Sequence, residues 1–284
     1  MTVSVMITTT GRTVDLRRTW HTLRRLNPQP LEVLITMDGC AAEAVEQIKA
    51  EVPGARLFVN PIGLGSVASR DRMLRNARGD LVLALDDDSY PEQLDCLARI
   101  VPLFGQRPNL AVLHFPQRTN EYPHTLKQTD FGSEHLTRSF ANSGAVLRQC
   151  NYLQLAGFEP RFFHMYEEAD YGLQCVAAGY EVLCSPVVTI RHHYSGQARD
   201  EIHVHHRHAR NEFWSTLIRC PLPFTVGMVA WRVFSQFRYA CRRGWSWIVR
   251  EPLWWCEALA GIPYCIRKRR PVPWAGYKRW LSLP

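Results

Sequence analysis

The sequence predicts an α/β fold: a mostly parallel sheet flanked by helices, followed by a basic and aromatic helical extension. Two observations carry this prediction. Short apolar runs alternate with helical patterns along the first hundred residues, and basic and aromatic residues accumulate after residue 201. Repeated strand–helix–strand units require right-handed crossovers between parallel strands. Ligands of such sheets bind beyond the carboxyl ends of the strands, so functional residues are expected there.

The first two strands are predicted from short apolar runs. Residues 3–7 form the first, which ends in a polar turn at residues 8–12. Apolar residues then recur at helical spacing from Leu16 to Leu26. A second buried strand, residues 31–37, runs into Asp38-Gly39. Both strands therefore end in polar residues.

The same alternation continues to residue 88. Residues 41–50 have helix-forming composition, and residues 55–59 read as a third strand. A helix over about 67–77 leads into a fourth strand, residues 81–85, which stops at Asp86-Asp87-Asp88. Because parallel strands end at one edge of a sheet, the acidic residues and the earlier polar turns are expected to meet there.

The pattern from about residue 91 to residue 200 is less regular. A helix is expected after Pro91, and residues 116–139 are rich in loop-forming residues. An acidic helix start is predicted at Glu167, and a last strand over 182–190 runs into Arg191-His192-His193. No internal repeat is visible.

Composition excludes several classes of protein. Of 284 residues, 46% are hydrophobic and 21% are charged, which excludes wholesale disorder. No stretch approaches the roughly 20 apolar residues that cross a bilayer, and residues 1–7 lack the positive region of a secretory signal. Nine cysteines without a Cys-x-x-Cys pair indicate a reduced compartment. A cytoplasmic protein is therefore expected.

Three adjacent carboxylates at the end of a buried strand repel one another and are costly to desolvate. Asp86 and Asp88 can face one side of the strand, while Asp87 faces the other. Mg²⁺ or Mn²⁺ would relieve the repulsion and bind substrate phosphates through its remaining positions. An acidic turn that caps the strand explains the same three residues, and the residues alone favour neither interpretation.

The order of the motifs resembles family 2 of the glycosyltransferases, nucleotide-sugar-dependent enzymes with the GT-A fold. The matching segments are 3–12, 35–40, Asn60 with the following glycine loop and Arg70, 79–88, 157–158, 167–173 and 178–180. Together they span about residues 3 to 200.

The resemblance implies a role for each matching position. Residues that would bind the nucleotide sugar are Thr8, Thr9, Thr10, Gly11, Arg12, Asp38, Gly39, Arg70, Asp86 and Asp87. Within this set, Asp38 would accept a hydrogen bond from the base and Asp86 would approach the ribose. The metal would be held by Asp88, with Asp86 and His192, although His193 is an alternative.

Glu167-Glu168-Ala169-Asp170 is similar to the acceptor-side acidic motif of the family. A carboxylate in hydrogen-bond reach can take the proton of an attacking hydroxyl. By position Glu168 would be this base, and Asp170 is the competitor. Acidic residues are also favoured in a helix first turn by the macrodipole, which suffices to explain Glu167.

A denser group of histidines, His203, His205, His206 and His208, follows. His203 and His206 could share a helix face and bind a transition metal. No cysteine or carboxylate joins them, so an exposed, partly cationic helix is the favoured interpretation.

From residue 202 onward there are 14 basic and 3 acidic residues, a net charge of +11 against +8 for the whole chain, together with eight of the nine tryptophans. Aromatic and basic residues suit the interface of an anionic membrane. Packing on the catalytic domain is the second interpretation. Nucleic-acid binding is the third, since no nucleic-acid module is recognisable.

The sequence thus predicts an inverting glycosyltransferase, a hexosyl- or deoxyhexosyltransferase. Residues 1–200 would be the catalytic domain, with 1–90 binding the nucleotide and 91–200 the acceptor, and 201–284 the helical tail. The acceptor would be a cell-surface saccharide or lipid-linked glycan, and the protein would lie on the inner face of the plasma membrane.

Two rivals stay open. A nucleotidyltransferase would need a basic triphosphate loop, for which only Arg12 is offered. A catalytically silent nucleotide-sugar-binding protein would keep the fold without a working base.

Overall fold

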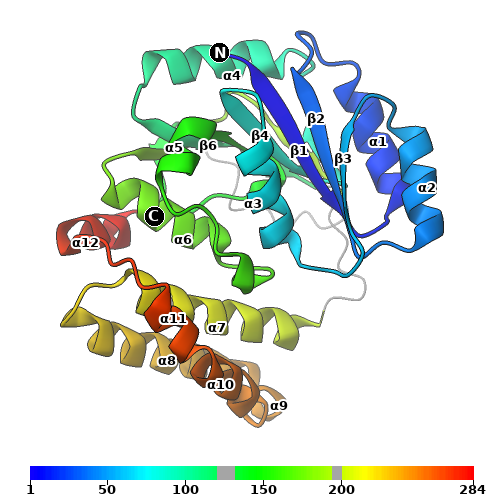
Figure 1. The fold of residues 1–284 in the computed structure, drawn as a ribbon. Coiled ribbons are helices and arrows are strands. Elements are labelled where there is room, and N and C mark those ends of the chain that lie inside the picture. The colour runs from blue at the N-terminus through cyan, green and yellow to red at the C-terminus, as the bar shows by residue number, and fades with distance from the viewer. Residues whose placement is uncertain (120–131, 194–199) are drawn as a thin grey trace.

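The computed structural model describes residues 1–119, 132–193 and 200–284. Its centre is an eight-stranded sheet in the order β3-β2-β1-β4-β9-β6-β10-β8 (Figure 1). One half is parallel and comprises β1 (Val3–Thr9), β2 (Glu32–Asp38), β3 (Arg56–Asn60) and β4 (Leu81–Asp86). The other half is mixed and comprises β9 (Ala145–Arg148), β6 (Leu110–His114), β10 (Glu181–Cys184) and β8 (His135–Leu136). The predicted α/β fold with a mostly parallel sheet is confirmed.

Helices cover both faces of this sheet. They are α1 (Thr13–Leu23), α2 (Ala42–Glu51), α3 (Ser66–Asn76), α4 (Cys96–Gln106), α5 (Gln149–Gln154) and α6 (Glu167–Ala177). Side chains alternate along β1: Val5 and Ile7 join the core that contains residues of α1, α2 and α4, whereas Met6 joins the core that contains residues of α3, α5 and α6. Burial on both faces explains why β1 reads as a mostly apolar run.

A second, three-stranded sheet lies at the end of β4. It consists of β5 (Ser89–Pro91), β11 (Ile190–His192) and β7 (Gln117–Arg118). The single strand predicted over 182–190 is therefore wrong, because β10 ends at Cys184 and β11, in the other sheet, begins at Ile190. The break falls at Ser185-Pro186, where proline has no N–H to donate to a sheet.

The C-terminal residues form six helices: α7 (Glu201–Arg219), α8 (Phe224–Arg243), α9 (Trp245–Ile248), α10 (Glu251–Ala260), α11 (Ile262–Arg267) and α12 (Trp274–Ser282). No helix among the described residues is long and apolar enough to cross a membrane. Helix α12 lies against α6, and α7 runs beneath the sheet domain (Figure 1). Buried Trp214, Trp254, Tyr277 and Trp280 belong to the same core as Met6 and Tyr171. Much of the tail's aromatic content is thus used in packing.

A buried ion pair joins α6 to the tail. Arg219 of α7 donates from Nε and Nη2 to the two oxygens of Asp170, at 3.1 and 3.0 Å. Ser215 Oγ and Gln174 Nε2 donate to the same carboxylate, at 2.7 and 2.8 Å. The side chains of Asp170 and Arg219 are only 1% and 4% exposed, so water cannot solvate them and this network must compensate both charges.

Replacing Asp170 by alanine is expected to lower the free energy of unfolding by about 3–5 kcal/mol, because Arg219 would stay buried without a carboxylate. Urea unfolding followed by circular dichroism measures the change. The matched control is Asp95→Ala, which removes an exposed pair with Arg99 and is expected to cost under about 1 kcal/mol. Equal losses for the two variants would contradict this account of α6 and α7.

Candidate active site

The polar ends of the parallel strands meet as predicted from their order. In the sheet register Thr8 of β1 lies beside Thr36 of β2 on one side and Asp86 of β4 on the other. A cavity of about 260 Å³ opens at this edge. It is lined by Thr8, Thr9, Thr10, Arg12, Asp38, Gly65, Ser66, Arg70, Asp86, Asp87, Phe163, His164 and Arg207.

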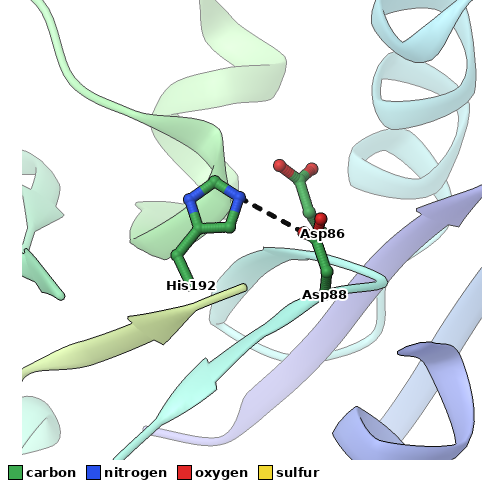
Figure 2. Close-up of side chains that lie close together, drawn as sticks. All are labelled: Asp86, Asp88 and His192. Carbon is green, nitrogen blue, oxygen red and sulfur yellow. Dashed lines mark ion pairs between the residues drawn. The ribbon is translucent and has the colours of Figure 1, made fainter. Parts of the chain in front are cut away.

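Asp86, Asp88 and His192 come together beside this cavity. Each can offer one ligand atom such that these atoms lie within 4.8 Å of one another (Figure 2). His192 reaches the acidic residues because β11 pairs antiparallel with β5, which places His192 opposite Ser89. A strand more than a hundred residues further along the chain therefore completes the cluster.

The donor atoms of this cluster fit a divalent cation. His192 Nδ1 lies 2.9 Å from Gln117 Oε1, an acceptor, so Nδ1 carries the hydrogen. In the neutral ring, Nε2 then presents its lone pair toward Asp88 Oδ1, 3.2 Å away. That carboxylate oxygen is buried and accepts no geometrically acceptable hydrogen bond from the described residues. Two facing electron-pair donors are the arrangement that a cation satisfies.

The carboxyl group of Asp88 is held in its charged form. Burial opposes ionisation, but His192, when Nε2 carries a proton in place of a cation, and the Arg12 guanidinium outweigh it and lower the pKa of Asp88. Arg12 Nη1 donates to Asp88 Oδ2 at 2.8 Å. A negative charge is therefore available to a metal at neutral pH.

Asp87 lines the cavity together with Asp86, and Arg12 pairs with both Asp87 and Asp88. The carboxylate of Asp87 accepts a hydrogen bond of 2.7 Å from Thr9 Oγ1 and is paired with the Arg12 guanidinium, whose Nε lies 3.2 Å away. The side chain of Asp87 is 1% exposed, whereas that of Arg12 is 44% exposed. Asp87 thus fixes Thr9 and Arg12 at the cavity wall.

Asp38 holds the loop that leads into α3. Its carboxylate accepts hydrogen bonds from Asn60 Nδ2 at 2.8 Å and from the backbone N–H groups of Leu64 and Gly65, each at 2.9 Å. It also lines the cavity. Its expected hydrogen bond to a nucleotide base stays a prediction, and any such bond would share the carboxylate with this loop.

Two glycines permit the close approach of this loop. Gly39 has φ +66°, and a β-carbon there would lie 2.8 Å from Gly63 N. Gly65 has φ +89°, and a β-carbon there would collide with the carbonyl oxygen of Phe163. Only glycine adopts these conformations without strain and without a clash.

Arg70 connects the donor side of the site to α6. This buried side chain donates from Nη1 to Glu167 Oε1 at 3.1 Å, and its Nη2 pairs with Asp86. Glu167 also accepts from Asn142 Nδ2 at 3.3 Å. Asp86 and the start of α6 are therefore held in a fixed relation.

Glu168 and Asp170, the two candidates for a base, lie in different surroundings. Glu168 is partly exposed, and its Oε1 lies 3.5 Å from the backbone N–H of Asn142. Burial and the nearby charge of Glu167 raise the pKa of Glu168 to about 8. Asp170 is instead occupied by Arg219, Ser215 and Gln174. Neither Glu168 nor Asp170 is among the residues that line the cavity.

Several residues of the site could not be found from the sequence. Gln117, which orients His192, follows β6 in a stretch that reads only as loop. Ser66, Phe163 and His164 line the cavity from the start of α3 and from the turn before α6. Phe163 has φ +66°, a conformation that no sequence signal announces at a phenylalanine. Arg207 arrives from α7, the expected cationic helix.

The chain is similar to known proteins in both sequence and fold. The model of the family described as Glycosyl transferase family 2 matches residues 4–171. The chain is 23% identical over 205 residues to "Uncharacterized glycosyltransferase YwdF" of Bacillus subtilis (strain 168), covering 69% of this chain and 75% of that protein.

Two solved structures share the fold. GalNAc-T7, solved with UDP, GalNAc and Mn²⁺, has a TM-score of 0.64 at 14% identity over 86% of this chain; the chain spans about half (50%) of that protein. S. aureus TarS 1-349, in complex with UDP-GlcNAc, has a TM-score of 0.63 at 14% identity, over 97% of this chain and 83% of that one.

Proposed function

This chain belongs to glycosyl transferase family 2, and we therefore propose that it transfers a sugar from a nucleotide-diphosphate sugar to a hydroxyl group of an acceptor. The observation that carries the proposal is the meeting of Asp86, Asp88 and His192 beside a cavity that is lined by Thr8, Thr9, Thr10 and Arg12. The nucleotide-sugar and Mn²⁺ complexes of the two structural neighbours support it.

Asp88, Asp86 and His192 would hold Mg²⁺ or Mn²⁺. When bound, this cation supplies positive charge against the departing nucleoside diphosphate. The residues of the chain itself prepare the place: Gln117 fixes the tautomer of His192, and Arg70 fixes Asp86. Thr8, Thr9, Thr10, Gly11 and Arg12 would lie against the nucleotide, with Asp38, Gly39 and Asp87 shaping that wall.

Glu168 is our candidate for the general base. A carboxylate whose pKa is raised to about 8 holds a proton more strongly than an ordinary one, which suits removal of a proton from an alcohol. Attack by that hydroxyl on the face opposite the departing diphosphate inverts the anomeric carbon. Asp170 is not our choice, because its carboxylate is committed to Arg219.

Residues 1–200 would carry out the reaction on a hexose or deoxyhexose, with 1–90 serving the donor and 91–200 the acceptor. The tail, 201–284, would support the acceptor side and touch an anionic membrane. Trp231 and Trp245 are 53% and 76% exposed, and Arg238 and Arg250 are exposed on the same helical region. A cell-surface saccharide or lipid-linked glycan is the acceptor that we propose.

Incubation with a panel of nucleotide sugars and of nucleoside triphosphates tests the reaction. We expect release of free nucleoside diphosphate from one nucleotide sugar when Mn²⁺ is present and no release when EDTA is present. Liquid chromatography measures the nucleoside diphosphate. Pyrophosphate released from a triphosphate and a sugar phosphate would indicate a nucleotidyltransferase instead. Binding without turnover across a full acceptor panel would indicate a silent binding protein.

A further inference from the structure

A second cavity of about 710 Å³ adjoins the first and shares Phe163 and Arg207 with it. We propose that this second cavity binds an anionic group, a phosphate or a carboxylate, carried by the acceptor. The inference rests on the proposed transferase function, since it names the chemical class of acceptor. None of Asp86, Asp87 and Asp88 lines this cavity, so an anion bound there would be separate from a diphosphate held at the metal cluster.

One face of α7 supplies most of the basic groups. His203, His206, Arg207 and Arg210 are spaced by three and four residues and line the cavity together with Trp214. Residues at this spacing share one face of an α-helix. The histidines that the sequence showed as a dense cluster are therefore divided, because His203 and His206 face this cavity whereas His205 hydrogen-bonds Glu251.

The charges of the lining are not balanced. Three arginines, Arg161, Arg207 and Arg210, face a single acid, Glu257. Arg210 is committed, since its Nη1 lies 2.8 Å from Glu257 and its Nη2 donates to the carbonyl of Phe162. Among the described residues, no carboxylate pairs with Arg161 or Arg207. Two guanidinium groups thus face the cavity without an anion.

Aromatic rings hold these two guanidinium groups in place. Arg161 lies over Tyr264, 4.5 Å from the ring centroid, and Arg207 lies over Phe163 at 5.0 Å. A stacked guanidinium keeps its N–H edge available, and that edge matches the two oxygens of a phosphate or carboxylate. Such charge-assisted, bidentate hydrogen bonds are stronger than neutral ones. An anion is therefore the ligand that would pair with the guanidinium groups of Arg161 and Arg207.

Binding of three sugars that differ only in charge tests the proposal. Glucose 6-phosphate, glucuronate and glucose are titrated into the full-length protein by calorimetry, with EDTA present so that no metal draws anions to Asp88. At least one anionic sugar should bind about ten-fold more tightly than glucose. Preference for glucose 6-phosphate identifies a phosphorylated acceptor, and preference for glucuronate identifies an acidic sugar.

Variants locate the site. Arg161→Gln and Arg207→Gln should each weaken binding of the anionic sugar about ten-fold, whereas Arg25→Gln, an exposed arginine at the end of α1, should leave it unchanged. Equal affinity for all three sugars, or equal losses in all three variants, would overturn the proposal. Binding of UDP with Mn²⁺ is measured separately on the same samples. Its absence in the wild type would count against the proposed donor and not against the second cavity.

Discussion

Replacing Asp88 by asparagine is expected to reduce metal-dependent sugar transfer by about 100- to 1,000-fold while the fold is kept. Asparagine preserves the shape of the side chain but removes the charge that faces His192 Nε2 across 3.2 Å. The Asp88 side chain is 2% exposed, so water cannot replace the lost carboxylate. Initial rates across a Mn²⁺ titration measure the loss, and thermal unfolding checks the fold.

The chain offers a matched control for this substitution. Asp15 also lies near Arg12, with its Oδ2 3.9 Å from Nη1, but it is not part of the metal cluster. Asp15→Asn should therefore keep both the rate and its dependence on Mn²⁺. Wild-type turnover in Asp88→Asn with an unchanged Mn²⁺ requirement would remove Asp88 from the proposed metal site.

The second large effect is expected at Glu168. Glutamine at this position should lower kcat about 100- to 10,000-fold, the contribution typical of a positioned general base. Only the ionised carboxylate accepts a proton, and burial with Glu167 raises the pKa of Glu168 to about 8. In the free wild-type enzyme kcat/KM should therefore rise as the pH approaches about 8 and level off above it.

The pH profile separates catalysis from a structural effect. In Glu168→Gln most of the activity should be lost, and kcat/KM should no longer rise as the pH approaches about 8. Asp170→Asn, which disturbs the pair with Arg219, should reduce stability, but its remaining kcat/KM should still rise with pH. If kcat/KM rises with pH in Glu168→Gln and not in Asp170→Asn, the general base is Asp170 and not Glu168.

The parallel half of the fold could be predicted because its signals are local. Strands β1, β2 and β4 are buried on both faces, so each reads as a mostly apolar run, whereas β3 lies at the edge of the sheet and is partly exposed. Because parallel strands end at one edge of the sheet, the sequence alone predicts that Thr8, Asp38 and Asp86 lie close together. Predicting the position of Asp86, Asp87 and Asp88 required no information about residues far away in the chain.

Other parts depend on partners far away in the chain. The position of His192 depends on pairing between β11 and β5, and its tautomer depends on Gln117. The sequence pattern cannot tell Glu168 from Asp170, because what separates them is Arg219, 49 residues later. The tail's tryptophans likewise look alike in sequence, yet Trp254 is buried and Trp245 is exposed.

The clamp between α6 and α7 has a consequence for experiments on the end of the chain. Asp170 lies two residues from Glu168 and forms a buried ion pair with Arg219 of the tail. Trp280, also in the tail, donates a hydrogen bond from Nε1 to the carbonyl of Arg138 at 2.8 Å. Deleting the last eighty residues would therefore remove the contacts that hold the acceptor half in place. A truncation or mutation there is expected to abolish activity even though every residue proposed to take part in the reaction is still present.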